Sequence, residues 1–200
     1  LADGQAFNKA AIVLPRGGVI VGRVTDELSL PVARVQVFSV FFPRSSAKGQ
    51  RTGNTVTTDD LGQFRLFGLS VGEYSVVAEA RGNTYVQPNA PPETEDDKLG
   101  YLTTYYPGTA DDSAAQRVRV AYGAETPGIE IRLVQGRLFR VSGMIRDSEG
   151  KPLTRGNGQL TRRNPGVNGY SSFGFSTDEQ GQFQMRNIPP GSYRLVVRQV

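Results

Sequence analysis

The sequence predicts an all-β protein made of two tandem copies of one small β-sandwich module. Three observations favour this fold class: an internal repeat, apolar residues that alternate with polar ones along short runs, and 24 Gly and 12 Pro among the 200 residues. Alternation with a period of two is typical of a strand with one face in the core, and frequent Gly and Pro indicate turns between strands.

The repeat consists of three blocks that occur in the same order in both halves of the chain. The matched blocks are residues 22–26 with 143–147, 58–64 with 177–183, and 72–77 with 191–196. The second and third pairs are 119 residues apart (183 − 64) and the first pair is 121 apart (147 − 26). A loop shortened between the first and second blocks explains the drift.

The start of the chain follows the same scheme. Ile12-Val-Leu14, Gly17 and the run 19–25 resemble Ile131-Arg-Leu133, Gly136 and the run 138–146. We therefore expect residues 1–14 to be a lead-in segment or to hold the last strand of a preceding module.

The strands are expected where the alternation is clearest. The apolar members of the three best runs are Val35, Val37 and Phe41, then Tyr74, Val76 and Ala78, and then Ile129, Ile131 and Leu133. Each run should place one face in a core. The best helical candidate, residues 111–116, is about one turn long.

The repeated blocks also predict turns. In residues 59–62 and 178–181, the leading Asp would cap a tight turn through its side chain, and the final Gly would take positive φ. Phe64 and Phe183 should be the first core residues after those turns. Tyr74 and Tyr193 follow the next turns, where a buried ring with its hydroxyl bonded to nearby backbone is expected.

The composition excludes many functions. The chain has no Cys, His or Trp, which removes disulfides, thiolate and imidazole catalysis, and the usual zinc ligands. Its net charge is +4, but the Arg residues are scattered and the one small cluster, Arg155, Arg162 and Arg163, is interpreted as a solvated loop. We expect no nucleic-acid partner and no cofactor, and no segment reaches the ~20 apolar residues of a membrane span.

The pattern G-x-V-x-D … P-V, then T-D-x-x-G-x-F, then G-x-Y-x-V resembles the carboxypeptidase regulatory-like domain family. The resemblance covers residues 18–80 and 138–200. It implies a transthyretin-like (prealbumin-like) Greek-key β-sandwich, related to carbohydrate-binding-like folds. Thr103-Thr-Tyr-Tyr-Pro-Gly108 with the run 128–133 is similar to the closing segment of tandem bacterial versions.

These matches predict the domain organisation. A first sandwich is expected over residues 15–134, with a long loop over 82–112, and a second over 135–200. The second copy has Gly156 where the first has Val35, and it ends before any closing strand. We therefore expect the second copy to be truncated at its C-terminus.

Four tyrosines are the best candidates for contact with a ligand or partner: Tyr85, Tyr101, Tyr105 and Tyr106. They fall in the long loop, and exposed Tyr rings can stack on sugars or anchor a protein. The alternative is that they pack beneath the loop and hold it to the sandwich. A sugar-binding module should present at least two of these rings on an open face, whereas a spacer should bury them.

The carboxylates and lysines give weaker signals. The recurring Asp26, Asp59, Asp60, Asp147 and Asp178 are interpreted as turn residues rather than as a glycosidase pair, and no D-x-D-x-D-G calcium loop is present. Ser45-Ser-Ala-Lys48 matches S-x-x-K but lies in a polar loop without the companion motifs. An intramolecular Lys–Asn isopeptide bond is rejected, because neither expected first strand contains Lys. No catalytic or metal-binding residue is predicted.

The leading functional prediction is a non-catalytic structural or interaction module of a bacterial extracytoplasmic multidomain protein, acting as a spacer or by protein contact. Its first partners would be the neighbouring modules of the same chain. A carbohydrate-binding module that uses exposed tyrosines on a polysaccharide is the alternative. A second alternative is an accessory domain of a peptidase or outer-membrane receptor. The family resemblance alone implies the extracytoplasmic location.

Overall fold

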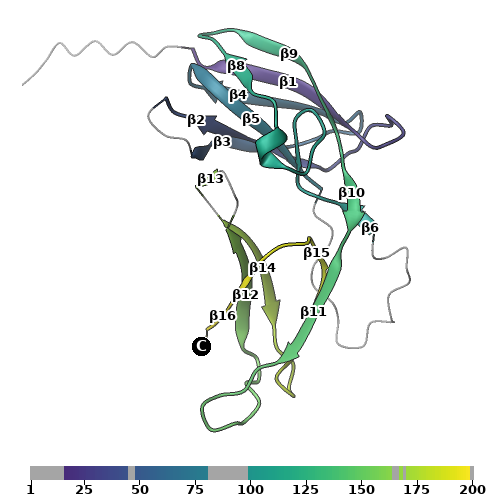
Figure 1. Ribbon diagram of the computed structural model, residues 1–200, viewed down its shortest axis with the longest axis vertical. Coiled ribbons are helices and arrows are strands. Elements are labelled where there is room, and N and C mark those ends of the chain that lie inside the picture. Colours follow the sequence, from purple (N-terminus) through teal and green to yellow (C-terminus); the bar gives the residue numbers. More distant parts are fainter. Residues whose placement is uncertain (1–15, 45–47, 81–98, 164–166, 169, 199–200) are drawn as a thin grey trace, which may run out of the picture.

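The computed structural model describes residues 16–44, 48–80, 99–163, 167–168 and 170–198. It confirms the predicted all-β fold. Two β-sandwich units follow one another along the long axis of the molecule and are joined through strand β10 (Gln135–Arg137) (Figure 1). The short 3-10 helix η2 (Asp112–Ala114) lies where the sequence predicted about one helical turn.

The first unit contains two sheets. One has the order β4-β1-β9, in which β1 is antiparallel to β4 and parallel to β9. The other has the order β3-β2-β5-β7, with β8 also pairing with β5, and β13, from the second half of the chain, adds to it beside β3. Their bounds are β1 (Gly18–Thr25), β2 (Gln36–Phe42), β3 (Gly49–Thr57), β4 (Gln63–Leu69), β5 (Gly72–Glu79), β7 (Thr104–Tyr105), β8 (Val118–Val120), β9 (Glu125–Arg132) and β13 (Val167–Asn168).

The core of the first unit lies between these sheets. Its fully buried members include Ile20 and Val24 of β1, Leu66 of β4, Val76 of β5 and Ile131 of β9. They alternate with exposed or half-buried residues on β1, β4 and β9, as the period of two predicted. Strand β2 departs from this alternation, because Phe38 and Val40 on its outer face are also buried.

The second unit is built on the same plan, with fewer strands among the described residues. Its sheets have the orders β11-β15 and β14-β12-β16. The bounds are β11 (Phe139–Met144), β12 (Asn157–Arg163), β14 (Tyr170–Ser176), β15 (Gln182–Ile188) and β16 (Arg194–Arg198). A smaller core of Leu160, Phe175, Phe183, Met185 and Ile188 lies between them, with the rings of Phe175 and Phe183 stacked at 4.2 Å.

The predicted turns are confirmed in both units. Asp59 Oδ1 accepts hydrogen bonds from the backbone N–H groups of Leu61 (3.0 Å) and Gln63 (2.7 Å). Asp178 Oδ1 accepts from the backbone N–H groups of Gln180 (2.9 Å) and Gln182 (2.7 Å) in the same way. Gly62 and Gly181, the last residues of these turns, have φ of 72° and 71°, a conformation that glycine adopts without strain.

The hydrogen bonds predicted for the two corner tyrosines are confirmed, although Tyr193 is half-buried. The Tyr74 hydroxyl donates to the Ser70 carbonyl at 2.8 Å, and the Tyr193 hydroxyl donates to the Pro189 carbonyl at 2.7 Å. Each tyrosine thereby ties the start of a strand to the turn before it. Tyr74 is fully buried and Tyr193 packs against the smaller core.

Candidate functional site

The recurring carboxylates serve the turns. Asp26 Oδ1 accepts from the N–H groups of Leu28 and Leu30 at 2.9 and 2.8 Å, and Asp147 Oδ1 repeats the arrangement in the second unit at 2.9 Å twice. Together with Asp59 and Asp178, they are committed to backbone donors. Among the described residues, no three Asp, Glu, His or Cys side chains gather in a way that could hold a metal ion.

The described candidate tyrosines lie in different surroundings: Tyr101 and Tyr106 pack against the larger core, and Tyr105 packs in a second cluster. Tyr85 lies outside the described residues. Tyr101 is on the short strand β6 (Leu99–Tyr101), half-buried against the larger core, with its hydroxyl 3.4 Å from Glu27 Oε2. Tyr106 is also half-buried against that core.

Tyr105, on β7, is the most deeply placed of the three that are described. It is 9% exposed and packs with Phe38 and Val40 on the outer face of β2. Burial, and then the nearby Asp112, raises the pKa of its hydroxyl to about 12. A ring in this position holds the segment after β6 to the sheet and does not offer a face to a ligand.

The tyrosines whose pKa is shifted do not favour acid–base chemistry. Burial raises the pKa of Tyr74, Tyr101 and Tyr193, and the shift carries each hydroxyl further from neutral pH. An acid or base for catalysis is instead tuned toward the working pH. Asp111 has its pKa lowered by hydrogen bonds from the Ser113 N–H and hydroxyl, which fits its place at the start of η2.

Two strand pairings join the units. β10 pairs with β6, so that Gly136 lies opposite Gly100. A side chain on Gly136 would push into Leu102, and one on Gly100 would push into the buried Leu138. In the second pairing, β13, which lies between β12 and β14 of the second unit, runs parallel to β3 of the first, with Val167 beside Gly49.

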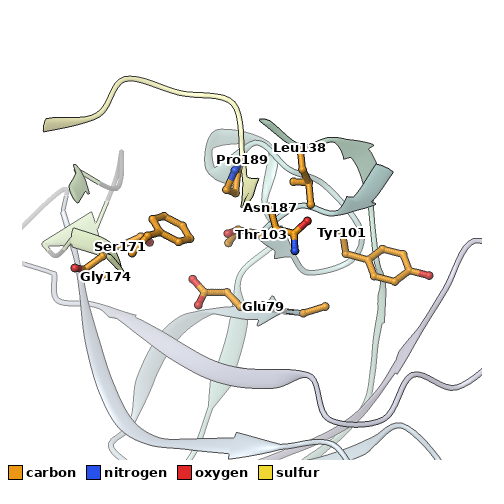
Figure 2. Close-up of a pocket in the computed structure, with 11 residues that line it drawn as sticks. Glu79, Tyr101, Thr103, Leu138, Ser171, Gly174, Asn187 and Pro189 are labelled. Carbon is orange, nitrogen blue, oxygen red and sulfur yellow. The ribbon is translucent and has the colours of Figure 1, made fainter. Parts of the chain in front are cut away.

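A cavity of about 140 Å³ lies at this junction. The first unit contributes Glu79, Tyr101 and Thr103, and the second contributes part of β14 together with Asn187 and Pro189. In Figure 2, the Glu79 carboxylate and the Asn187 amide face this cavity, whereas the Tyr101 ring points away from it. Ligand pockets usually have ~300–1,000 Å³, so this cavity suits a few waters better than a substrate.

A wider, shallow hollow of about 670 Å³ lies on the first unit, on the side formed by β1 and β9. Tyr106, Arg23 and Arg132 line it. Both arginines already make hydrogen bonds, Arg23 to the Leu61 carbonyl and Arg132 to the Ser29 hydroxyl, each at 3.1 Å. Nothing in the sequence pattern pointed to this hollow, because it combines residues from β1, β9 and the segment after β7.

The interpretation of the basic cluster as a solvated loop was wrong for Arg162 and Arg163, because both lie in strand β12. The Arg162 guanidinium donates to the Pro190 carbonyl at 3.1 Å and hydrogen-bonds the Tyr193 hydroxyl. It therefore stabilises the turn before β16. Within the described segments, no helix is long and apolar enough to cross a membrane.

Comparison with known proteins gives a limited result. No protein family matches the chain. No curated protein matches it either. Among solved structures it is similar to a Streptococcal ancillary pilin, with a TM-score of 0.36 and 15% identity over 92% of this chain and 54% of that one.

Two further structures give comparable values. For the Bacillus anthracis TIE protein the TM-score is 0.35 and the identity 14%, over 92% of this chain and 31% of that one. For the shaft pilin spaA from Lactobacillus rhamnosus GG, the TM-score is 0.31 and the identity 10%, over 94% of this chain and 89% of that one. The chain thus spans 54% and 31% of the first two proteins. Likenesses this weak carry no functional conclusion.

Proposed function

We propose that this chain is a non-catalytic structural module that holds its neighbours at a fixed spacing in a bacterial extracytoplasmic multidomain protein. The observation that carries the proposal is the double strand pairing between the units, β10 with β6 and β13 with β3. Two strand pairings at separate places hold the units against rotation about the linker. A single flexible linker would leave them free to rotate.

The use of the polar residues supports the same proposal. Asp26, Asp59, Asp147 and Asp178 accept backbone hydrogen bonds in turns, and the described candidate tyrosines pack against cores. The carboxypeptidase regulatory-like resemblance of the repeat also favours an accessory domain over an enzyme. An accessory role beside a peptidase or an outer-membrane receptor is a particular form of this function.

Among the described residues, the hollow beside Tyr106 is the wide surface that a candidate tyrosine lines, so it is the one considered for carbohydrate binding. Only one of the three described candidate tyrosines, Tyr106, lines it, so two stacked rings are not available there from this set. A panel of polysaccharides and cell-wall glycans tests the alternative directly. Saturable binding that Tyr106→Ala abolishes would replace the spacer proposal with a carbohydrate-binding one.

The spacer function is tested by a distance distribution between the two units. Because the chain has no Cys, cysteines introduced at Tyr122 and Glu149, both about 70% exposed, would take spin labels at those two sites alone. Pulsed electron paramagnetic resonance should then give one narrow distance distribution. Gly136→Val, which pushes Leu102 aside, should broaden it.

Leu61→Val is the control, because Leu61 is 54% exposed in the turn before β4 and does not line the junction cavity. It should leave the distribution narrow. A parent distribution as broad as that of Gly136→Val would contradict the proposal, because the units would then already move freely.

A further inference from the structure

The wide hollow beside β1 and β9 holds two arginines that the strand pairing brings together. Arg23 of β1 and Arg132 of β9 both line it. The two strands are parallel neighbours (Figure 1), with Thr25 opposite Arg132. Because Val24 and Ile131 face the core, the residues next to them in sequence face outward. The two guanidinium groups therefore approach the same space from adjacent strands.

Hydrogen bonds hold both guanidinium groups in place and leave most of their donors for a ligand. Arg23 donates through Nε to the Leu61 carbonyl, and Arg132 donates through Nη2 to the Ser29 hydroxyl. Among the described residues, these are the bonds that the two groups make. An arginine has several N–H donors in a planar fork, so both Nη groups of Arg23 stay available. A side chain that is already ordered loses less entropy when it binds.

Ser29 has a conformation that its role in holding Arg132 explains. Its φ is 63°, in the left-handed region that favours glycine, and the equivalent residue of the second unit is Gly150, with φ of 81°. The two turns are otherwise alike, because Asp26 and Asp147 accept the same pair of backbone hydrogen bonds. Glycine would form the first turn without strain. Serine instead supplies the hydroxyl that accepts from Arg132.

Three leucines lie beside the hollow and form what we call the leucine rim. Two of them flank Ser29, and the carbonyl of the third accepts from Arg23. All are more than half exposed: Leu28, Leu30 and Leu61. The equivalent residues of the second unit are polar: Glu149, Lys151 and Gln180. Since the turns make the same backbone bonds in both units, the backbone does not require leucine. Apolar side chains exposed around a charged site are typical of a protein contact.

We infer that the hollow binds a Glu or Asp side chain of a partner protein, presented on an extended segment with apolar residues on either side. The forks of Arg23 and Arg132 match the two oxygens of a carboxylate. Glu130 also lines the hollow, so the described lining residues carry one net positive charge, which suits a single carboxylate better than a phosphate dianion. A Cβ on Gly128 meets nothing within 4 Å, which leaves room for the backbone of the segment.

The leucine rim favours a peptide over a sugar as the occupant. A sugar would use the hydroxyl groups and the Tyr106 ring of the hollow and would leave the three leucines exposed. Apolar side chains next to the bound carboxylate would cover them. The inference goes beyond the spacer function, because the described lining residues include none from the strand pairs that join the units.

An NMR titration of the isotope-labelled chain with the peptide Gly-Ser-Leu-Val-Glu-Val-Leu-Gly-Ser tests the inference. The Nε–H signal of Arg23 and the backbone amides of Ser29 and Gly128 should shift and saturate. A peptide with Gln in place of its Glu should bind about tenfold more weakly, because it loses the charge-assisted hydrogen bonds.

Substitutions of single arginines locate the site. Arg23→Gln and Arg132→Gln should each weaken binding of the Glu peptide about tenfold. Arg65→Gln is the matched control, because Arg65 lies on β4 of the same sheet, forms an exposed ion pair with Glu125 and does not line the hollow. This variant should bind the peptide like the parent.

Ser29→Gly separates a positioning role from damage to the fold. The substitution copies the glycine of the second unit and removes the strain, so the urea midpoint should not fall. Binding of the Glu peptide should still weaken severalfold, because Arg132 loses the hydroxyl that holds it. Unchanged binding in this variant would contradict the role given to Ser29.

Three outcomes would overturn the inference as a whole. They are the absence of saturable shifts at the hollow, equal binding of the Glu and Gln peptides, and a loss with Arg65→Gln as large as that with Arg23→Gln. Polygalacturonate is the competing probe. If it saturates the hollow and the Glu peptide does not, the site belongs to an acidic polysaccharide and not to a protein partner.

Discussion

At the scale of single residues, Tyr105 shows how packing changes chemistry. Its ring is 9% exposed between the segment after β6 and the outer face of β2. Burial penalises the phenolate, and Asp112 repels it, so that the pKa is raised from 10.0 to about 12. The folded chain therefore holds this proton more firmly than the unfolded chain does.

This shift predicts a loss of stability in alkali. The contribution of Tyr105 is present in full below pH 10, where both states are protonated, and is lost as the pH rises through about 12. Denaturant titrations at a series of pH values should show the free energy of unfolding falling over this window. Tyr105→Phe cannot ionise, so the fall should be smaller in that variant.

Tyr122→Phe is the control for the alkaline measurement, because the same hydroxyl is removed from a side chain that is 71% exposed. The free energy of unfolding of this variant should fall with pH as steeply as that of the parent. Equal slopes for Tyr105→Phe and the parent would contradict the assignment of the alkaline loss to Tyr105.

At the scale of strands, the two glycines at the same repeat position make a matched pair. Gly22→Ala should destabilise the first unit by ~1–3 kcal/mol, because the new methyl group meets the backbone of β9 and cannot be accommodated by a side-chain rotation. Gly143→Ala should cost less, because its methyl group meets only the Phe183 ring. Urea denaturation of both variants measures the difference. Equal losses of stability in the two variants would show that the close approach of β9 is not the reason for glycine at position 22.

Local sequence patterns predicted the turns well, but they did not predict which outer strand faces are buried by distant segments. Asp59 and Gly62 act within a few residues of each other, so their hydrogen bonds and positive φ could be predicted from the sequence alone. The burial of Phe38 and Val40 could not, because it depends on Tyr105, which lies far along the chain. The same long-range packing decides the candidate site, since it places Tyr105 in a core and Tyr106 beside a hollow.

At the scale of the whole molecule, the two units differ in how much core they have. Among the residues that the structure describes, fifteen buried residues form the main core of the first unit, and five form that of the second. Buried apolar area is the main source of stability. The strand pairings at the junction involve few residues, so they orient the units without making one continuous core.

This difference predicts two thermal transitions, with the second unit unfolding first. Phe64 and Phe183 occupy equivalent positions and are 4% and 8% exposed, so truncation of each to Ala should cost ~3–5 kcal/mol. In differential scanning calorimetry, Phe183→Ala should lower the first transition alone, and Phe64→Ala should lower the second. The two variants make the same chemical change at the same repeat position, so each is the control for the other. A single transition that both variants shift equally would mean that the junction couples the cores, and that the chain unfolds as one body despite its two separate interiors.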